Sequence, residues 1–107
     1  MAEEFCAVFV TVGKVEEAEK IANALVEEKL AACCNMVPAI RSIYRWQGQI
    51  CRDSETLLIF KTRRALFERL RARVKELHSY TVPEIVALPI VEGHRPYMEW
   101  LQAETQP

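Results

Sequence analysis

The segment CCNMVPAIRSIYRWQGQICRDSETLLIFKTR, residues 33–63, decides the fold. It contains two apolar-rich stretches, Cys33 to Trp46 and Gln49 to Thr62, which are joined by the dipeptide Gln47-Gly48. A two-residue connection that ends in glycine predicts a β-hairpin, because the tight turn requires a positive φ that glycine adopts without strain. Gln47 is a less favoured first turn residue than Asn or Asp, so a bulged three-residue turn is the alternative.

The two arms of this hairpin are long for the size of the chain. Each would span about 14 residues, or about 45 Å at about 3.3 Å per residue. A compact domain of about 100 residues has a radius of gyration near 13 Å. We therefore expect the tip, which carries Ile43, Tyr44, Trp46 and Ile50, to project beyond its own core into a neighbouring subunit. The alternative is that Pro38 interrupts the first arm and the tip folds back.

The composition indicates a single domain over residues 1–107, half hydrophobic and with a formal net charge of -1. This balance predicts no attraction to nucleic acid or to anionic membranes. No apolar run is long enough to span a bilayer, and the acidic segment Met1-Ala2-Glu3-Glu4 does not resemble a secretory signal. The four cysteines show no C-x-x-C spacing. We therefore expect reduced thiols in a cytoplasmic protein.

The segments outside the hairpin predict two more strands and three helices. Phe5 to Val12 is a continuous apolar run, typical of a strand covered on both faces, and Pro83 to Ile90 is a second short strand. Helical spacing of apolar residues predicts helices over Val15 to Leu30 and Arg64 to His78. Pro96 suits the first turn of a short terminal helix. The resulting order is that of an α+β, ferredoxin-like split βαβ sandwich.

The positions of the prolines agree with this topology. In a ferredoxin-like sheet the first and third strands are central, and the second and fourth lie at the edges. Proline cannot donate a hydrogen bond to a neighbouring strand and therefore belongs at an edge. Pro38 falls in the second strand, and Pro83 and Pro89 bound the fourth. The two exposed edges also favour a rotationally symmetric oligomer, which would cover them.

Four strings in this chain resemble the CutA family, the divalent-cation tolerance proteins. They are LAACCNMVPAIRSIYRWQGQI, DSETLLIFKTRR, ELHSYTVPEIVALPI and YMEWL, in this order over residues 30–101. The resemblance implies a ferredoxin-like domain in an interlocked homotrimer, similar in shape to the PII signalling proteins. It also implies tolerance to copper and other divalent metals. The clefts between subunits would be lined by Tyr44, Trp46, Glu55, Lys61, His78, Tyr80 and Glu84.

The chain departs from some members of that family at a metal site. Those members have a cysteine at the end of the first strand and two neighbouring histidines before the Y-x-x-P-E string. Here Val10 occupies the first position, and Leu77-His78 supplies only one imidazole. A copper site of that form is therefore not expected in this chain.

The residues themselves offer few ligands for copper or zinc. These metals prefer imidazole and thiolate, and the chain has two histidines, His78 and His94. A histidine at a helix end more often caps the helix or faces solvent. His78 and Glu84 would form a site if the turn between them brings them together. We predict this pair as ligands of a divalent copper or zinc ion, and we expect no organic cofactor.

Lys61 and Glu55 form the second group of candidate residues. Alternation places Lys61 on the same strand face as Leu57 and Ile59, near a buried surface where a lysine requires a partner. Glu55 lies on the same face of the same strand. The two would form an ion pair at an interface or contact a bound ligand. Together with Tyr80 and Tyr44 we predict them as residues of a ligand-binding cleft.

The aromatic residues of the hairpin form the third group. Tyr44 and Trp46 share one face of the strand with Ile40, where they would stack on a ligand or anchor an interface. Aromatic residues are common interface anchors, and we predict Trp46, Tyr44 and Ile43 as the interface.

The chain contains no catalytic motif such as G-x-S-x-G, a Walker loop or H-E-x-x-H, so we predict that it is not an enzyme. We predict a trimer that acts in divalent-metal tolerance by binding ions or by signalling. One alternative is a PII-like sensor of a small anionic metabolite, and another is a scaffold for an unidentified protein partner.

Overall fold

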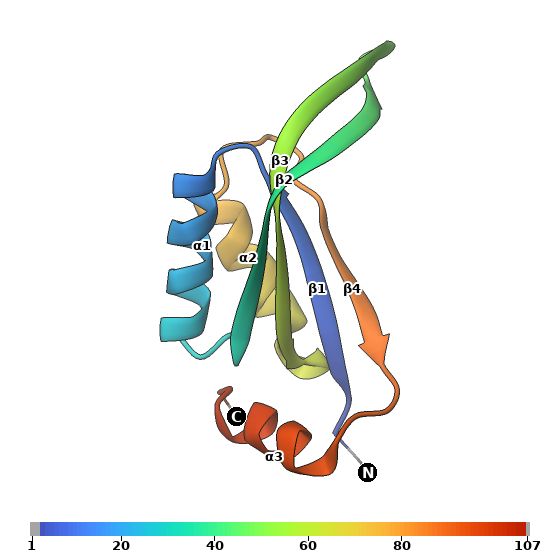
Figure 1. The fold of residues 1–107 in the computed structure, drawn as a ribbon. Helices are drawn as coiled ribbons and strands as arrows, with labels where there is room; N and C mark the ends of the chain where they lie inside the picture. The colour runs from blue at the N-terminus through green and yellow to red at the C-terminus, as the bar shows by residue number, and fades with distance from the viewer. Residues whose placement is uncertain (1–2, 107) are drawn as a thin grey trace.

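The structure is a computed structural model that describes residues 3–106. Two helices pack against one face of a four-stranded antiparallel sheet, and a third lies across one end (Figure 1). The elements are β1 (Phe5–Val12), α1 (Val15–Glu27), β2 (Cys33–Trp46), β3 (Gln49–Arg63), α2 (Phe67–Leu77), β4 (Ile85–Ile90) and α3 (Arg95–Ala103). The strand order β2-β3-β1-β4 places β1 and β3 in the centre. The predicted α+β, ferredoxin-like class is therefore confirmed.

The hairpin closes through the predicted two-residue turn. Gln47 and Gly48 have φ angles of 51° and 80°, and Trp46 pairs directly with Gln49. Positive φ at both central residues is the geometry of a type I′ turn, whose twist matches that of the flanking strands. The bulged three-residue alternative does not occur.

Pro38 does not divide the second strand. Two residues of β2, Pro38 and Ala39, oppose the single residue Thr56 of β3, which produces a β-bulge. Ala39 has a φ of 61°, in the left-handed region that L-residues other than glycine rarely adopt. A bulge bends a strand and increases its twist. The two strands accordingly curve away from the sheet above this point (Figure 1).

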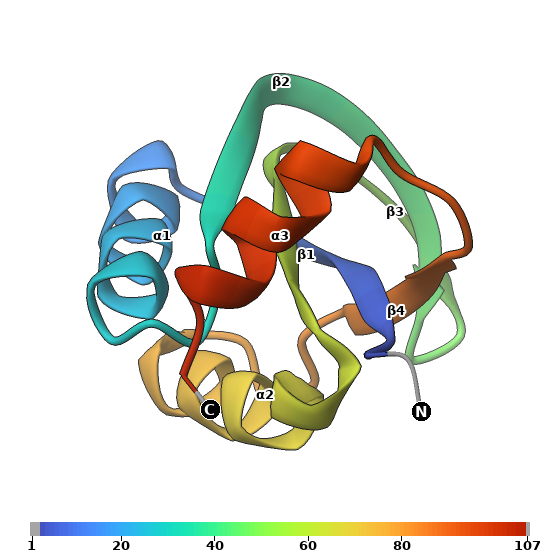
Figure 2. The ribbon, with the colours of Figure 1, turned by 90° about the horizontal axis from the view of Figure 1, so that it is seen from below.

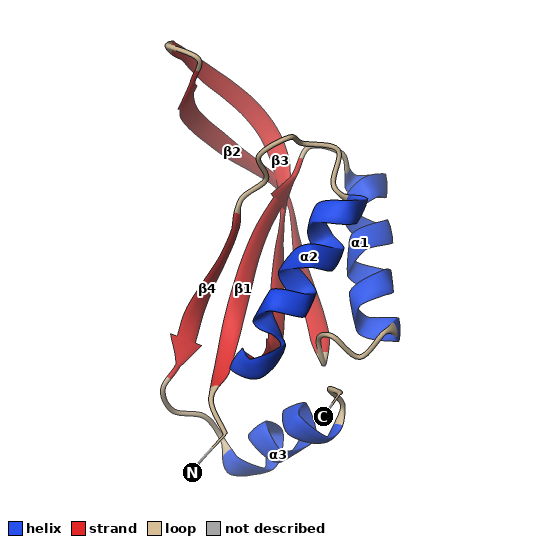
Figure 3. Cartoon of the chain, turned by 180° about the vertical axis from the view of Figure 1, so that it is seen from behind, coloured by secondary structure: helices blue, strands red, loops and turns tan. Residues whose placement is uncertain are grey.

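The hairpin extends well beyond the layer of helices (Figure 3). The molecule measures 45 × 25 × 22 Å and has a radius of gyration of 14.4 Å. At the tip, the side chains of Ile43, Tyr44, Trp46 and Ile50 are between 40% and 68% exposed. Projection beyond the core is therefore confirmed, whereas insertion into a neighbouring subunit remains a prediction.

The hydrophobic core lies between the sheet and the helices α1 and α2. Its largest fully buried side chains come from both layers: Val8, Val10, Val12, Ile21, Leu25, Leu58, Phe60, Leu70 and Val74. Each strand contributes alternate residues, because successive side chains of a strand point to opposite faces. Alternation therefore places the remaining residues of β1 and β3 on the second face of the sheet.

No helix covers the second face of the sheet, so the prediction that the first strand is covered on both faces is wrong within residues 3–106. Phe9 and Ile59 are only partly buried there, and Val86 and Leu88 of β4 are 49% and 51% exposed. The physical reason is handedness. Both strand–helix–strand connections are crossovers between parallel strands of one sheet, and right-handed crossovers bring α1 and α2 to the same side.

The predicted helices and the last strand differ from the observed ones at their ends. α1 stops at Glu27, because Lys29 adopts a left-handed φ of 61°. α2 is preceded by a short 3-10 turn over Arg64–Leu66, and β4 begins at Ile85. α3 has proline in its first turn, as predicted, and crosses the lower end of the sheet (Figure 2). Within residues 3–106, no helix is long and apolar enough to cross a bilayer.

Candidate functional site

The candidate site is centred on Glu55, at the point where β3 leaves the sheet and enters the hairpin. Its side chain is buried, with 6% of the residue exposed. The hydroxyl of Tyr80 donates a hydrogen bond to Glu55 Oε2 at 2.8 Å. No lysine, arginine or histidine of residues 3–106 lies within 4.0 Å of this carboxylate. Burial of a carboxylate without a positive partner is costly, which makes Glu55 the candidate contact for a cation that residues 3–106 do not supply.

Tyr80 is held above Glu55 by the segment between α2 and β4. Its backbone N–H donates to His78 Nδ1 at 3.1 Å. Its ring lies against Gly13, where a Cβ atom would approach the Tyr80 hydroxyl oxygen to 2.8 Å. Burial, and then the hydrogen bond to Glu55, raise the pKa of Tyr80 well above its usual range. The phenol therefore stays protonated near neutral pH and acts as a donor.

His78 is buried behind Tyr80, and no part of its side chain is exposed. Its Nε2 lies 2.8 Å from the carbonyl oxygen of Thr11, which can only accept. Its Nδ1 accepts the Tyr80 N–H and lies 3.6 Å from Glu17 Oε2. These partners assign the neutral tautomer with the proton on Nε2. Both ring nitrogens are engaged, so His78 would have to break one of these bonds to bind a metal.

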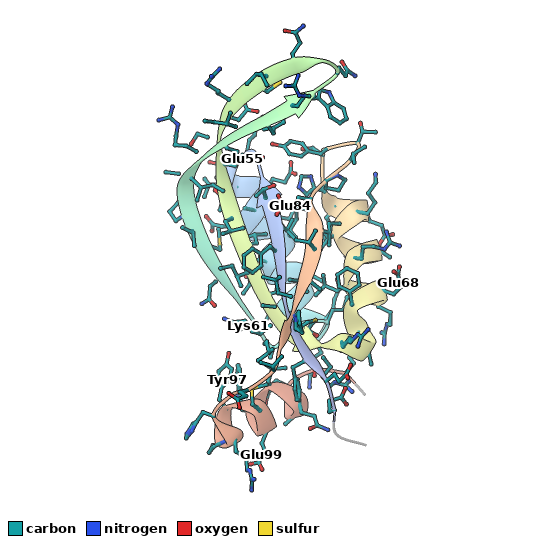
Figure 4. The ribbon with its side chains drawn as sticks, turned by 90° about the vertical axis from the view of Figure 1, so that its right-hand side faces the viewer. Glu55, Lys61, Glu68, Glu84, Tyr97 and Glu99 are labelled. Carbon is teal, nitrogen blue, oxygen red and sulfur yellow. The ribbon has the colours of Figure 1, made fainter. Side chains whose placement is uncertain are left out.

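Glu84, the predicted metal partner of His78, has an exposed side chain just before β4. Figure 4 places Glu84 and Glu55 toward the hairpin end of the sheet. Within residues 3–106, no group of three or more His, Cys, Asp or Glu side chains is arranged to hold a metal ion. The metal ligation predicted for His78 and Glu84 stays a prediction, and a complete site requires further ligands from water or from a second copy.

Lys61 does not pair with Glu55 within the chain. They lie six positions apart on an extended strand, which corresponds to about 20 Å. Lys61 lies instead near Tyr97 at the other end of the sheet (Figure 4). Its Nζ donates to Asn35 Oδ1 and lies 3.8 Å from Cys33 Sγ. The residues that we expected to share one cleft therefore form two groups in a single chain.

The predicted interface residues Ile43, Tyr44 and Trp46 are exposed on the projecting part of the hairpin. The Tyr44 hydroxyl donates to the carboxylate of Asp53, and this bond raises the pKa of Tyr44 to about 12. Sequence reasoning missed Asp53, although its two-residue spacing from Glu55 places both carboxylates on one strand face.

The sequence patterns also did not indicate that Gly13 and Glu17 belong to the site. Glu17 accepts hydrogen bonds from the Ser79 N–H and hydroxyl, at 3.0 and 3.1 Å. The partners are 62 residues apart in the chain, and no sequence signal indicates that they meet. Together with Gly13, they fix the position of the segment that carries Tyr80.

A four-stranded split βαβ sheet with a projecting hairpin defines a ferredoxin-like domain. The buried carboxylate of Glu55, which has no cationic partner within residues 3–106, marks its candidate cation site. The family model described as "CutA1 divalent ion tolerance protein" matches residues 6–104. The chain therefore belongs to the CutA1 family, and the resemblance found in the sequence is confirmed.

Individual relatives support this assignment. The chain is 58% identical, over 92% of its length and 95% of the relative, to the divalent-cation tolerance protein CutA of Thermus thermophilus. It is 44% identical, over 94% of its length, to the human protein CutA, of which it spans only 56%. Much of that longer relative therefore has no counterpart in this chain.

Solved structures agree with the fold. A divalent cation tolerance protein from Thermus thermophilus superposes with a TM-score of 0.93 at 56% identity, covering 95% of this chain and 99% of the other. CutA1 from Oryza sativa superposes with a TM-score of 0.95 at 45% identity, and the match covers 97% of this chain and 95% of the other. A structure from Archaeoglobus fulgidus superposes with a TM-score of 0.92 at 40% identity, covering 95% of this chain and 99% of the other. That protein is described as periplasmic. The cytoplasmic location of this chain therefore stays a prediction.

Proposed function

We propose that this chain acts in divalent-cation tolerance as a homotrimer that binds metal ions in clefts beside the hairpin. The observation that carries the proposal is the buried carboxylate of Glu55, which has no cationic partner within the described chain. A bound divalent cation would supply the missing charge. The names of the relatives, which refer to divalent cations, favour the same chemistry.

Two exposed apolar surfaces support the homotrimer. One is the uncovered face of the sheet, where Val86 and Leu88 are about half exposed. The other is the hairpin tip, where Ile43 and Trp46 are 68% and 46% exposed. Large apolar side chains exposed to this extent are typical of association sites. Closed rotational symmetry would bury both surfaces without leaving an open, growing sheet.

The carboxylates are the first ligands that we propose. Glu55 offers an oxygen beside the one that Tyr80 occupies, and Glu84 is exposed at the same end of the sheet. His78 would become a ligand only if it gave up the Tyr80 N–H or the Thr11 carbonyl. Copper and zinc remain the predicted metals, and Mn²⁺ tests the preference of carboxylate oxygens for harder ions.

The anion-binding alternative relied on Lys61 in the same cleft as Glu55. Lys61 is hydrogen-bonded to Asn35 and lies away from Glu55 (Figure 4). Within one chain Lys61 therefore does not lie beside Glu55, and we do not propose an anionic ligand there.

Calorimetric titration of chelator-treated protein with Cu²⁺, Zn²⁺ and Mn²⁺ tests the proposal. We expect saturable binding of at least one ion in the wild type and a loss of at least tenfold in affinity in Glu55→Gln. Glu99→Gln, on the exposed helix α3 (Figure 4), is the matched control and should bind as the wild type does. Light scattering on the same samples should give the mass of three chains. The absence of binding by all three ions would refute the metal site.

A further inference from the structure

We infer that the hairpin joins neighbouring copies of this chain head to tail, with an arginine-bearing face of one hairpin packed on an aromatic face of the next. Both faces belong to residues 41–54, the part of the hairpin above the β-bulge, and the hairpin extends beyond the layer of helices (Figure 3). The inference rests on the homotrimer of the proposed function. It adds which surfaces of two copies meet, and by what chemistry.

The register of the hairpin sorts its side chains into two chemically different faces. Residues that pair directly across antiparallel strands point to the same side, and successive residues of a strand point to opposite sides. One side, the arginine face, consists of Arg41, Ile43, Arg45, Ile50, Arg52 and Ser54. The other side, the aromatic face, consists of Ser42, Tyr44, Trp46, Gln49, Cys51 and Asp53. The hydrogen bond from the Tyr44 hydroxyl to Asp53 agrees with this division.

Each face exposes groups that have no partner in the same chain. The arginines of the arginine face are exposed, and none of them lies within 4.0 Å of a carboxylate of residues 3–106. Ile43 and Ile50, on the same face, are 68% and 48% exposed. On the aromatic face, Trp46 is 46% exposed, and the exposed Asp53 has no cationic partner in the described chain.

The two faces complement each other. The arginine face carries positive charges alone, and the aromatic face carries the negative charge of Asp53 beside two aromatic rings. Planar guanidinium groups stack on tyrosine and tryptophan rings and pair with carboxylates. Contact between two arginine faces would bring like charges together, and contact between two aromatic faces would leave both arginine faces uncovered. The head-to-tail contact buries both kinds of face, and a rotation that repeats it closes a ring.

Thiol cross-linking tests which faces meet. Cys51 supplies a partly exposed thiol on the aromatic face, and Ser54→Cys supplies one on the arginine face. All proteins in this experiment also carry Cys33→Ala and Cys34→Ala, while Cys6 is buried. Bismaleimidoethane should link two and three chains when both thiols are present. Proteins with Cys51 alone, or with Ser54→Cys and Cys51→Ser, should remain single chains on a denaturing gel.

Charge reversal tests the chemistry of the contact. Arg45→Glu together with Arg52→Glu should raise the dissociation constant of the trimer by about 100-fold or more, because negative charges then face Asp53. Addition of Asp53→Arg restores opposite charges and should recover about tenfold of this loss. Lys20→Glu, on the exposed surface of α1, is the matched control and should leave the constant unchanged. Sedimentation over a dilution series measures each protein, after circular dichroism has verified that it is folded.

The failure of this inference is distinguishable from the failure of the proposed function. A wild type with the mass of three chains, but with no link in the two-thiol protein or with links in either single-thiol protein, would overturn the head-to-tail contact and leave the trimer in place. An unchanged constant after both arginine reversals, or further weakening by Asp53→Arg, would also overturn it. A wild type with the mass of one chain would refute the trimer and this contact together. Metal binding is measured separately and does not enter this test.

Discussion

The uncompensated charge of Glu55 makes a specific prediction for stability in the absence of metal. Replacement by glutamine keeps the size of the side chain and an oxygen that accepts the Tyr80 hydroxyl. The neutral hydrogen bond is weaker than the charged one by about 1 kcal/mol, and the buried amide N–H2 group that glutamine adds costs about 1 kcal/mol more. Burial of an unpaired charge costs several kcal/mol, and the residue is only 6% exposed. The balance predicts that Glu55→Gln stabilises the metal-free protein by about 2 kcal/mol.

Thermal unfolding of chelator-treated protein at several concentrations measures this change. A gain of this size corresponds to roughly 8 °C in Tm for a domain of about 100 residues. The exposed control Glu99→Gln should change the free energy of unfolding by no more than about 0.5 kcal/mol. A lower Tm for Glu55→Gln would contradict the reasoning, because it would mean that a cationic group of a second copy already compensates the carboxylate.

Three further predictions concern the hairpin and the alkaline stability of the fold. Trp46→Asp should abolish the trimer, and a folded variant that still has the mass of three chains by light scattering would exclude this anchor. Ala39→Gly should stabilise the fold by up to about 1 kcal/mol in urea unfolding, because glycine relieves the left-handed φ of 61°; a loss would contradict this. The pKa values of Tyr44 and Tyr97 are raised from 10.0 to about 12, and that of Cys34 from 9.0 to about 12. The fold therefore favours their neutral forms, so their contribution to stability is complete below pH 9 and is lost as the pH rises to 12. Urea midpoints that stay constant over that range would refute this.

Local sequence signals were sufficient for most of the fold. The turn at Gln47-Gly48 was predictable because positive φ in a two-residue hairpin is a local steric requirement. The central position of β1 and β3 followed from the placement of Pro38 and Pro89, because proline lacks the donor that a central strand requires. The ends of α1 and β4 were less predictable, since end residues have weak preferences and depend on tertiary contacts.

The candidate site was only partly predictable. Alternation correctly placed Glu55 and Lys61 on one strand face, but it carried no information about distance along the strand to a partner. The sequence suggested a helix-capping or exposed role for His78. Its actual partners, the Thr11 carbonyl and the Tyr80 N–H, come from another strand and a loop. No local pattern encodes such a meeting.

By itself, the sequence determined the elements, their order and the family, because hydrophobic period, turn chemistry and proline placement act over a few residues. Only the tertiary structure decided which polar groups share a buried space. It separated Lys61 from Glu55, engaged both nitrogens of His78, and left one face of the sheet open. The physical reason is that burial and hydrogen bonding across the sheet depend on side chains tens of residues apart, and their meeting is fixed only when the layers pack.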